Sequence, residues 1–215
     1  MESIPTSEFF IEHYNLEEIN ELKQSASKSL PPNSYVTTND VITSHLWKVF
    51  AKLRNFPPKE NSKMLNVCNL REKKPSIPPH YFRNCALTIH TNATGEELAN
   101  TPLSTLAPRV HAEIHSYRNQ YVDQDLQLLN SIATRNPSLK GVNFEVDLFG
   151  NDIWFSSWAS FPVYDADFGK GKPVWFHTPC LVVPNTWVIL PAPPKMGGVI
   201  VIAMLNSSVK QAFKK

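Results

Sequence analysis

The chain has 215 residues, of which 42% are hydrophobic and 19% are charged. This composition is typical of a globular protein with a sizeable core and argues against extensive disorder. Lys and Arg number 21 against 19 Asp and Glu, and because the basic residues are scattered rather than clustered, nucleic acid is not expected as a partner.

The three cysteines, Cys68, Cys85 and Cys180, show none of the spacings typical of metal or redox motifs. Buried thiols in a reducing compartment are the favoured interpretation, and a catalytic cysteine is the weaker alternative. The N-terminus lacks the pattern of a signal peptide, and the longest apolar run, 199–205, is too short for a bilayer that needs about 20 residues. These features predict a cytoplasmic protein with no membrane partner.

The first half of the chain predicts a strand at 9–11 and then two helices. Asn15 can cap the first helix, and the second begins near Thr38 or Asn39. The apolar residues at helical spacing in the second helix are Val41, Ile42, Leu46, Val49, Phe50 and Leu53. Strands are expected at 64–70 and 85–90, separated by a proline-rich segment.

The second half predicts helices at 103–117 and 124–134 and then a series of strands. Pro108 lies within the first of these helices and is expected to start or kink it. The expected strands are 153–157, 174–177, 186–190 and 199–205, and Asn206 is expected to cap a short terminal helix. Without an internal repeat or a linker, this order favours one mixed α/β domain.

The run 164–173 reads Tyr-Asp-Ala-Asp-Phe-Gly-Lys-Gly-Lys-Pro and is the most distinctive motif of the chain. An isolated Asp-Phe-Gly is also found in protein kinases, but no glycine-rich phosphate loop, Val-Ala-Ile-Lys strand or His-Arg-Asp loop accompanies it here. The kinase interpretation is therefore rejected.

Other segments accompany this run: His-Leu-Trp at 45–47, Asn-Leu-Arg at 69–71, Pro-Pro-His-Tyr-Phe-Arg-Asn at 78–84 and Ser-Ser-Trp at 156–158. In this order the segments resemble the BAHD acyltransferases, which transfer acyl groups from coenzyme A to alcohols and amines and carry an Asp-Phe-Gly-Trp-Gly signature. The resemblance covers essentially the whole chain and only the C-terminal half of the family's two-domain fold.

The resemblance implies a mixed β-sheet with packed helices, one half of the chloramphenicol-acetyltransferase-like architecture. Residues 1–215 would then form a single C-terminal-type domain, with the N-terminal catalytic half absent. The family's catalytic His-x-x-x-Asp motif is missing from these residues, because none of the histidines at 13, 45, 80, 90 and 177 is followed four positions later by Asp. No catalytic residue is therefore assigned.

The resemblance gives the signature run a structural role, in which Asp167 forms a salt bridge with Arg71. Phe168, Gly169 and Gly171 complete the motif, and both glycines are expected to adopt backbone angles that other residues avoid. Residue 170 is Lys where the family has Trp, which removes a large packing surface. The alternative is an ordinary surface acid in a glycine-containing turn.

Substrate contacts are also implied by the resemblance. Ser156 and Trp158 match positions that line the acceptor pocket, although aromatic side chains in this region could instead pack the sheet. Coenzyme A is expected near Thr37 and Thr38, where free backbone N–H groups at a helix start suit phosphate oxygens. Ordinary helix capping is the favoured alternative there, because Asp40 is unfavourable for an anion.

His111 and His115 lie one helical turn apart, a spacing that resembles half of a zinc site. No third ligand is signalled, so a polar helix face is favoured and no metal is assigned. The resulting prediction is an acyltransferase that uses acyl-CoA as a co-substrate and a small alcohol or amine as acceptor, with little activity in this isolated half. The alternative is a non-catalytic module that binds a ligand, docks on a complementary half or self-associates.

Overall fold

The computed structural model describes residues 7–71, 77–120, 122–136, 138, 146–147, 150–179, 181, 183–206 and 209. Its centre is a mixed sheet of the strands β1 (Ser7–Tyr14), β2 (Asn61–Asn69), β3 (Ala86–Thr94), β4 (Ile153–Ser157), β5 (Thr186–Pro191) and β6 (Val199–Asn206). The spatial order is β1-β6-β5-β4-β2-β3. The pairs β2–β4 and β4–β5 are parallel and the other neighbours are antiparallel, so three central strands share one direction.

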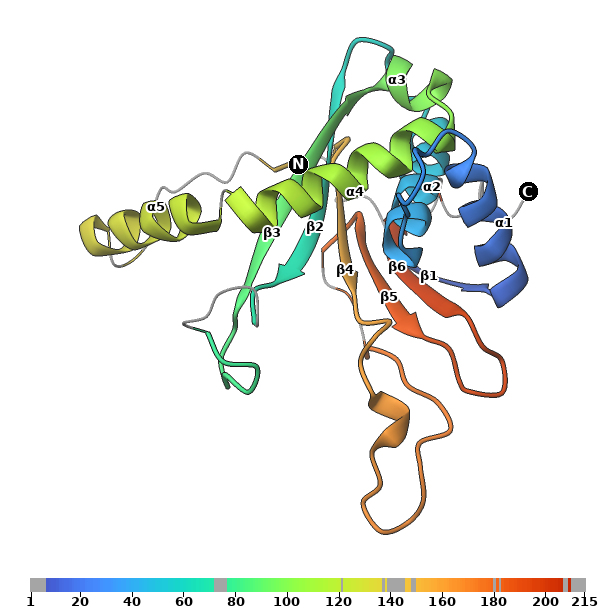
Figure 1. Cartoon of the computed structure of the whole chain (residues 1–215), viewed down its shortest axis with the longest axis vertical. Helices are drawn as coiled ribbons and strands as arrows, with labels where there is room; N and C mark the ends of the chain where they lie inside the picture. The colour runs from blue at the N-terminus through green and yellow to red at the C-terminus, as the bar shows by residue number, and fades with distance from the viewer. Residues whose placement is uncertain are drawn as a thin grey trace.

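The helices are α1 (Leu16–Ser27), α2 (Thr38–Leu53), α3 (Gly95–Asn100), α4 (Leu103–Gln120) and α5 (Val122–Arg135). In Figure 1, α4 crosses in front of β2 and β3, while α1 and α2 lie beside β6 and β1. A short 3-10 helix, Val163–Asp165, lies in the long segment between β4 and β5. The expected mixed sheet with packed helices is therefore confirmed.

Helix starts were predicted well because side-chain caps mark them. Asn15 accepts from the backbone N–H of Glu18 and forms a capping box, as Thr37 does with Asp40 at the start of α2. Pro108 lies inside α4 rather than at its start, five residues after Leu103. The short helix α3 was not predicted.

One predicted strand is wrong and two expectations remain outside the described residues. The segment 174–177 is irregular and belongs to none of the strands of the sheet, and its Val174 is largely exposed. The apolar run Val174-Trp175-Phe176 is too short to distinguish a strand from a loop. The terminal helix expected after Asn206 and the environment of Cys180 lie in residues that the structure does not describe, whereas Cys68 and Cys85 are buried thiols.

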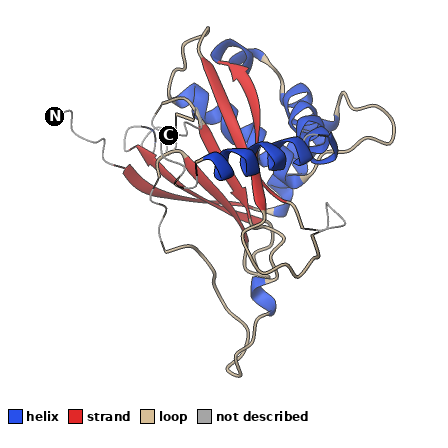
Figure 2. Ribbon diagram, turned by 90° about the vertical axis from the view of Figure 1, so that its left-hand side faces the viewer, coloured by secondary structure: helices blue, strands red, loops and turns tan. Residues whose placement is uncertain are grey.

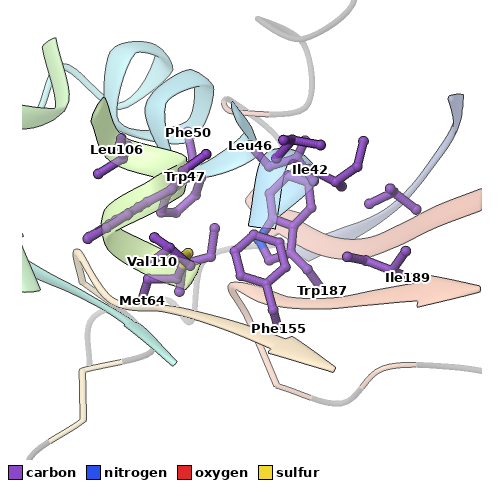
Figure 3. Close-up of a cluster of buried hydrophobic side chains, with 14 of the residues drawn as sticks. Ile42, Leu46, Trp47, Phe50, Met64, Leu106, Val110, Phe155, Trp187 and Ile189 are labelled. Carbon is purple, nitrogen blue, oxygen red and sulfur yellow. The ribbon is translucent and has the colours of Figure 1, made fainter. Parts of the chain in front are cut away.

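The main core lies between one face of the sheet and helices α1, α2 and α4 (Figure 3). Trp187 of β5 is at its centre, with ring centroids 6.0 Å from Phe10, 6.2 Å from Phe50 and 5.9 Å from Phe155. Trp47 of α2 is fully buried and donates its indole N–H to the hydroxyl of Ser62 over 2.8 Å. The aromatic side chains thus fix α2 on the sheet.

A smaller apolar cluster occupies the opposite face of the sheet. Because side chains alternate along a strand, Val188 and Leu190 of β5 join Ile200 and Ile202 of β6 on this face. It is covered in part by residues of the long β4–β5 segment, including Trp158 and the half-buried Phe176. Figures 1 and 2 show this segment extending well beyond the end of the sheet.

In the described part of the chain, no helix has the length and apolar character needed to span a membrane.

Candidate functional site

A pocket of about 320 Å³ lies where α2 begins, between α4 and the ends of β2 and β4. Cys68 and Asn69 of β2 and Ser157 of β4 contribute to its wall, and each of these residues is at the carboxyl end of its strand. β2 and β4 run parallel, so their carboxyl ends meet at one edge of the sheet. Open α/β sheets bind ligands at this edge, which makes the pocket the candidate site.

The start of α2 closes one side of the pocket with its capping box. The hydroxyl of Thr37 accepts from the backbone N–H of Asp40 over 3.2 Å, and the Asp40 carboxylate accepts from the backbone N–H of Thr37 over 2.8 Å. Thr37, Asn39 and Asp40 line the pocket, whereas Thr38 does not. The capping role that was favoured for this segment is confirmed, and the buried carboxylate lies where a phosphate was considered.

Asp40 also joins α2 to α4 through His111. The Nδ1 of His111 lies 2.7 Å from the same carboxylate oxygen that accepts from Thr37. The imidazole is held between two rings, since Tyr35 meets it edge-on with centroids 5.0 Å apart and His115 stacks at 6.1 Å. The pocket therefore contains an imidazole whose position is fixed on several sides.

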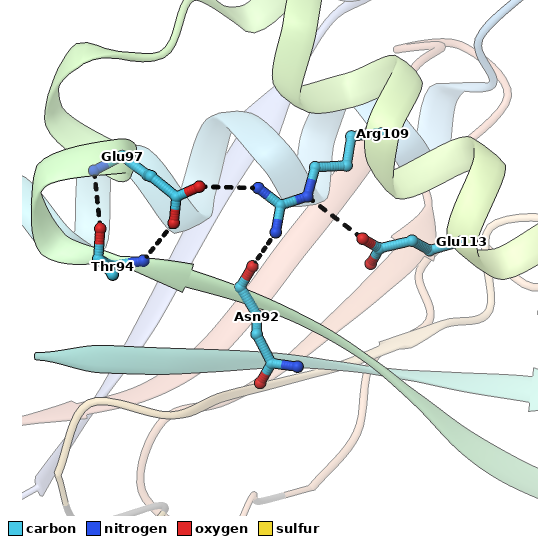
Figure 4. A network of polar contacts seen from close by, with 5 residues as sticks. All are labelled: Asn92, Thr94, Glu97, Arg109 and Glu113. Carbon is cyan, nitrogen blue, oxygen red and sulfur yellow. Dashed lines mark hydrogen bonds and ion pairs between the residues drawn. The ribbon is translucent and has the colours of Figure 1, made fainter.

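The helix that carries His111 is anchored by Arg109 (Figure 4). Its guanidinium bonds the carboxylates of Glu97 over 3.3 Å and Glu113 over 3.2 Å, and it also donates to the backbone oxygen of Asn92. Glu97 in turn accepts from the backbone N–H of Thr94, which is the main reason that its pKa is lowered; Arg109 lowers it further. This network connects α3 and β3 to the turn of α4 that precedes His111.

The spacing of His111 and His115 resembles half of a zinc site, but the described residues place no third ligand beside them. Within the described ranges, no group of three His, Cys, Asp or Glu side chains is arranged to hold a metal ion. The Nδ1 of His111 is also directed to Asp40. The two imidazoles line an organic-ligand-sized pocket instead.

Ser156 and Trp158, the residues expected to contact an acceptor, do not line this pocket. The indole N–H of Trp158 donates to the Ser156 hydroxyl over 2.9 Å, and the ring stacks on Phe161 with centroids 5.9 Å apart. Trp158 also packs on the apolar cluster of the opposite sheet face. This geometry favours the packing alternative for Trp158, while its contact with an acceptor stays a prediction.

Ser157, rather than Ser156, lies on the pocket side of β4. The buried Phe155 belongs to the helix-side core, so the alternation of a strand places residue 157 on the same face. That alternation was visible in the sequence, but the family resemblance drew attention to the neighbouring serine. The pocket-lining residue could therefore have been identified from the strand pattern alone.

The predicted salt bridge between Arg71 and Asp167 is not formed in this structure. Asp167 accepts instead from the backbone N–H groups of Gly169 over 2.7 Å and Gly171 over 3.1 Å. Arg71 donates to the side chain of Asn69 and to the backbone oxygens of residues 81 and 83. Each side chain thus satisfies its own local turn, which explains why neither reaches the other.

The signature run otherwise has the expected backbone. Gly169 and Gly171 adopt φ angles of 85° and 98°, the left-handed region that favours glycine. No atom lies within 4 Å of a Cβ built at either residue, so the backbone angle and not crowding requires glycine here. Phe168 is 94% exposed, and the large apolar residue of the motif therefore packs on nothing within the described chain.

Asn66 is a pocket residue that the sequence analysis missed. It lies on β2 between Met64 and Cys68, shares their helix-facing side, and is only 5% exposed. Its side-chain amide nitrogen is buried and has no hydrogen-bond partner among the described residues. An Asn in the middle of an apolar strand face was the available signal, since buried polar groups are normally paired.

Comparison with known proteins places these observations in a family. The family model described as the Transferase family matches residues 2–215. The chain belongs to this family, that of the BAHD acyltransferases. Shikimate O-hydroxycinnamoyltransferase of Nicotiana tabacum is 24% identical over 100% of the chain and 48% of its own length. Agmatine coumaroyltransferase-1 of Hordeum vulgare is 26% identical over 94% of the chain and 46% of its own length.

Solved structures show the same fold. The F. graminearum TRI101 complex with coenzyme A and deoxynivalenol matches with a TM-score of 0.85 at 22% identity, over 100% of this chain and 48% of that one. Vinorine synthase matches with a TM-score of 0.72 at 19% identity, over 97% and 46%. The BAHD chain described here thus spans about half the length of the relatives it matches, as expected for one domain of a two-domain fold.

Proposed function

We propose that this chain forms the C-terminal half of an acyl-CoA-dependent acyltransferase that acylates an alcohol or an amine. The observation that carries the proposal is the family match over residues 2–215 together with coverage of only about half of each relative. The named relatives support both acceptor classes, since one is an O-acyltransferase of shikimate and another acts on agmatine. The presence of coenzyme A in the TRI101 structures supports acyl-CoA as co-substrate.

In this proposal the chain supplies binding walls and a complementary half supplies the base. The family's His-x-x-x-Asp histidine would deprotonate the acceptor for attack on the thioester carbonyl, and the proton would reach the departing thiolate of coenzyme A. General-base catalysis of this kind contributes roughly 10²- to 10⁴-fold to the rate. None of the seven histidines of the chain is followed by Asp at the required spacing, so the isolated half is expected to be almost inactive.

Complementation tests the proposal. The chain would be assayed alone and after co-expression with the N-terminal half of a family acyltransferase, with release of coenzyme A from acetyl-CoA and hydroxycinnamoyl-CoA as the readout. Turnover is expected only with both halves, and it should disappear when the partner's catalytic histidine is replaced by alanine. Equal turnover by this chain alone would overturn the division of roles.

A second function, docking without catalysis, is favoured by exposed apolar side chains in the projecting segment, residues 158–185 between β4 and β5. Phe168 and Val174 are 94% and 88% exposed, and Trp175 is also accessible. Monomers rarely leave such groups of residues uncovered unless a partner binds them. The mass of the native protein separates the two functions. A species of about twice 24.3 kDa that contains both halves in one chain supports the enzyme, and a 24.3 kDa chain held in an inactive complex supports docking.

A further inference from the structure

The charges around the pocket at the start of α2 limit what can bind there. Of the described residues that line it, none is Lys or Arg. The residue with a buried carboxylate is Asp40, which is 3% exposed and already accepts two hydrogen bonds. A phosphate would therefore lose its hydration next to an anion and find no permanent cation in return, which makes it a poor ligand for this pocket.

Two polar groups for which the described residues provide no hydrogen-bond partner define the complementary ligand. Nδ1 of His111 must donate to the Asp40 carboxylate, so in the neutral imidazole Nε2 is an acceptor. The buried side-chain amide nitrogen of Asn66 is a donor without a partner among the described residues. A ligand that satisfies both must offer an O–H or N–H donor and an oxygen acceptor, and hydroxyl and amide groups do so without a charge.

The rest of the pocket agrees with an uncharged, partly apolar ligand. Tyr35 and Phe161 supply aromatic surface, and Ser157 and Thr37 supply hydroxyls. The volume of about 320 Å³ suits a small organic group and falls within the usual range for such sites. Asn66 also has the feature expected of a binding group, because a buried amide left unpaired destabilises the free protein unless a ligand satisfies it.

We propose that this pocket binds an uncharged group bearing hydroxyls or amides through Nε2 of His111, which Asp40 orients, and through the side-chain amide of Asn66. The proposal rests on the proposed acyltransferase function and identifies which part of the substrates the pocket takes. Two sources share the required chemistry: the pantetheine arm of acyl-CoA, which carries two amides and a hydroxyl, and an uncharged alcohol acceptor. Whichever of the two binds, the phosphate-bearing end of coenzyme A lies outside this pocket.

Ligand titrations followed by NMR test the proposal on the intact chain. The probes are pantetheine, benzyl alcohol as an uncharged acceptor and 3′,5′-ADP as the phosphate-bearing end of coenzyme A. Saturable binding of pantetheine or benzyl alcohol that shifts the resonances of Asn66 and His111 is expected, and the probe that binds identifies the source. Binding of 3′,5′-ADP at these residues, or of none of the three probes, would overturn the proposal.

Two variants separate binding from folding. His111→Asn keeps a nitrogen near the Nδ1 position to bond Asp40 but lacks Nε2, and Asn66→Leu removes the unpaired amide at similar size. Each should weaken probe binding about tenfold or more. His90→Asn and Asn130→Leu, at exposed positions of β3 and α5, are the matched controls and should leave affinity unchanged.

The unfolding temperature of Asn66→Leu distinguishes a binding role of the Asn66 amide from a structural role. Asn66→Leu should unfold at the same or a higher temperature, because it removes a buried polar group that has no partner in the free protein. A lower unfolding temperature with unchanged ligand affinity would show that the amide serves the fold. If the probes bind as expected but complementation yields no turnover, the acyltransferase proposal fails while the pocket assignment stands.

Discussion

The helix-covered core and the projecting segment between β4 and β5 differ in how far their large apolar side chains are buried. In the core, Trp47 and Trp187 are fully buried and the aromatic rings contact one another across α2 and the sheet. In the projecting segment, Phe168 is exposed, and Asp167 accepts hydrogen bonds from the backbone N–H groups of Gly169 and Gly171. The core is complete within the described residues, whereas Phe168 of the projecting segment packs on nothing there.

This difference shows why the two regions were not equally predictable. The core follows from periodicity, because helices and strands place apolar residues on one face whatever the remainder of the protein does. The contact expected for the motif in the projecting segment came from the family resemblance and not from periodicity. The motif's local turn forms without a partner, and its tertiary contact with Arg71 does not form.

Replacing a tryptophan in each region gives the largest expected contrast. Trp47→Ala should lower the free energy of unfolding by about 3–5 kcal/mol, since it removes a fully buried ring and leaves Ser62 without its donor. Trp175→Ala, at a side chain that is 45% exposed in the projecting segment, should cost less than about 0.5 kcal/mol. Urea denaturation measures both, and comparable losses would refute the assignment of the segment as independent of the core.

The fold could be predicted in most of its elements because its signals are local. Asn15 and Thr37 mark helix starts, and proline pairs separate the early elements. What failed was either very short, as with α3, or ambiguous, as with the irregular segment 174–177. In both cases too few residues are present for a period to develop.

The site was less predictable because it depends on contacts between distant segments. Asp40 and His111 are 71 residues apart, and nothing in the sequence shows that they meet at 2.7 Å. Asn66 becomes significant only when its amide is found buried without a partner. Ser157 is different, because strand alternation from Phe155 would have placed it on the pocket side.

Replacing Arg109, which lies between the core and the site, should have a smaller effect on stability than replacing Trp47. Arg109→Met keeps the aliphatic stem but removes the bonds to Glu97, Glu113 and the backbone of Asn92, and should cost about 1 kcal/mol. Arg135→Met at the exposed end of α5 is the control and should be nearly neutral. Thermal denaturation compares the two. A larger probe-binding defect than stability defect in Arg109→Met would show that the network also positions His111.

His45 on α2 predicts a modest pH dependence of the free energy of unfolding. Burial lowers the pKa of this imidazole below its usual value, so the folded protein keeps it neutral. As the pH falls below about 6.5, the unfolded chain takes up the proton and the folded protein resists it, so stability is lost on acidification. His45→Gln should reduce that slope in denaturation curves. An unchanged slope in His45→Gln would contradict the prediction.

The smallest expected effect is the most informative about the projecting segment. A double-mutant cycle with Arg71→Met and Asp167→Asn should give a coupling energy near zero in this chain, within about 0.3 kcal/mol, because the two side chains bond to different turns. A coupling of several kcal/mol in the isolated chain would mean that the family's salt bridge forms in solution. The same cycle repeated in the complex with a complementary half is the sharper measurement. Coupling that appears only there would show that the second domain, and not the signature run itself, brings Asp167 to Arg71.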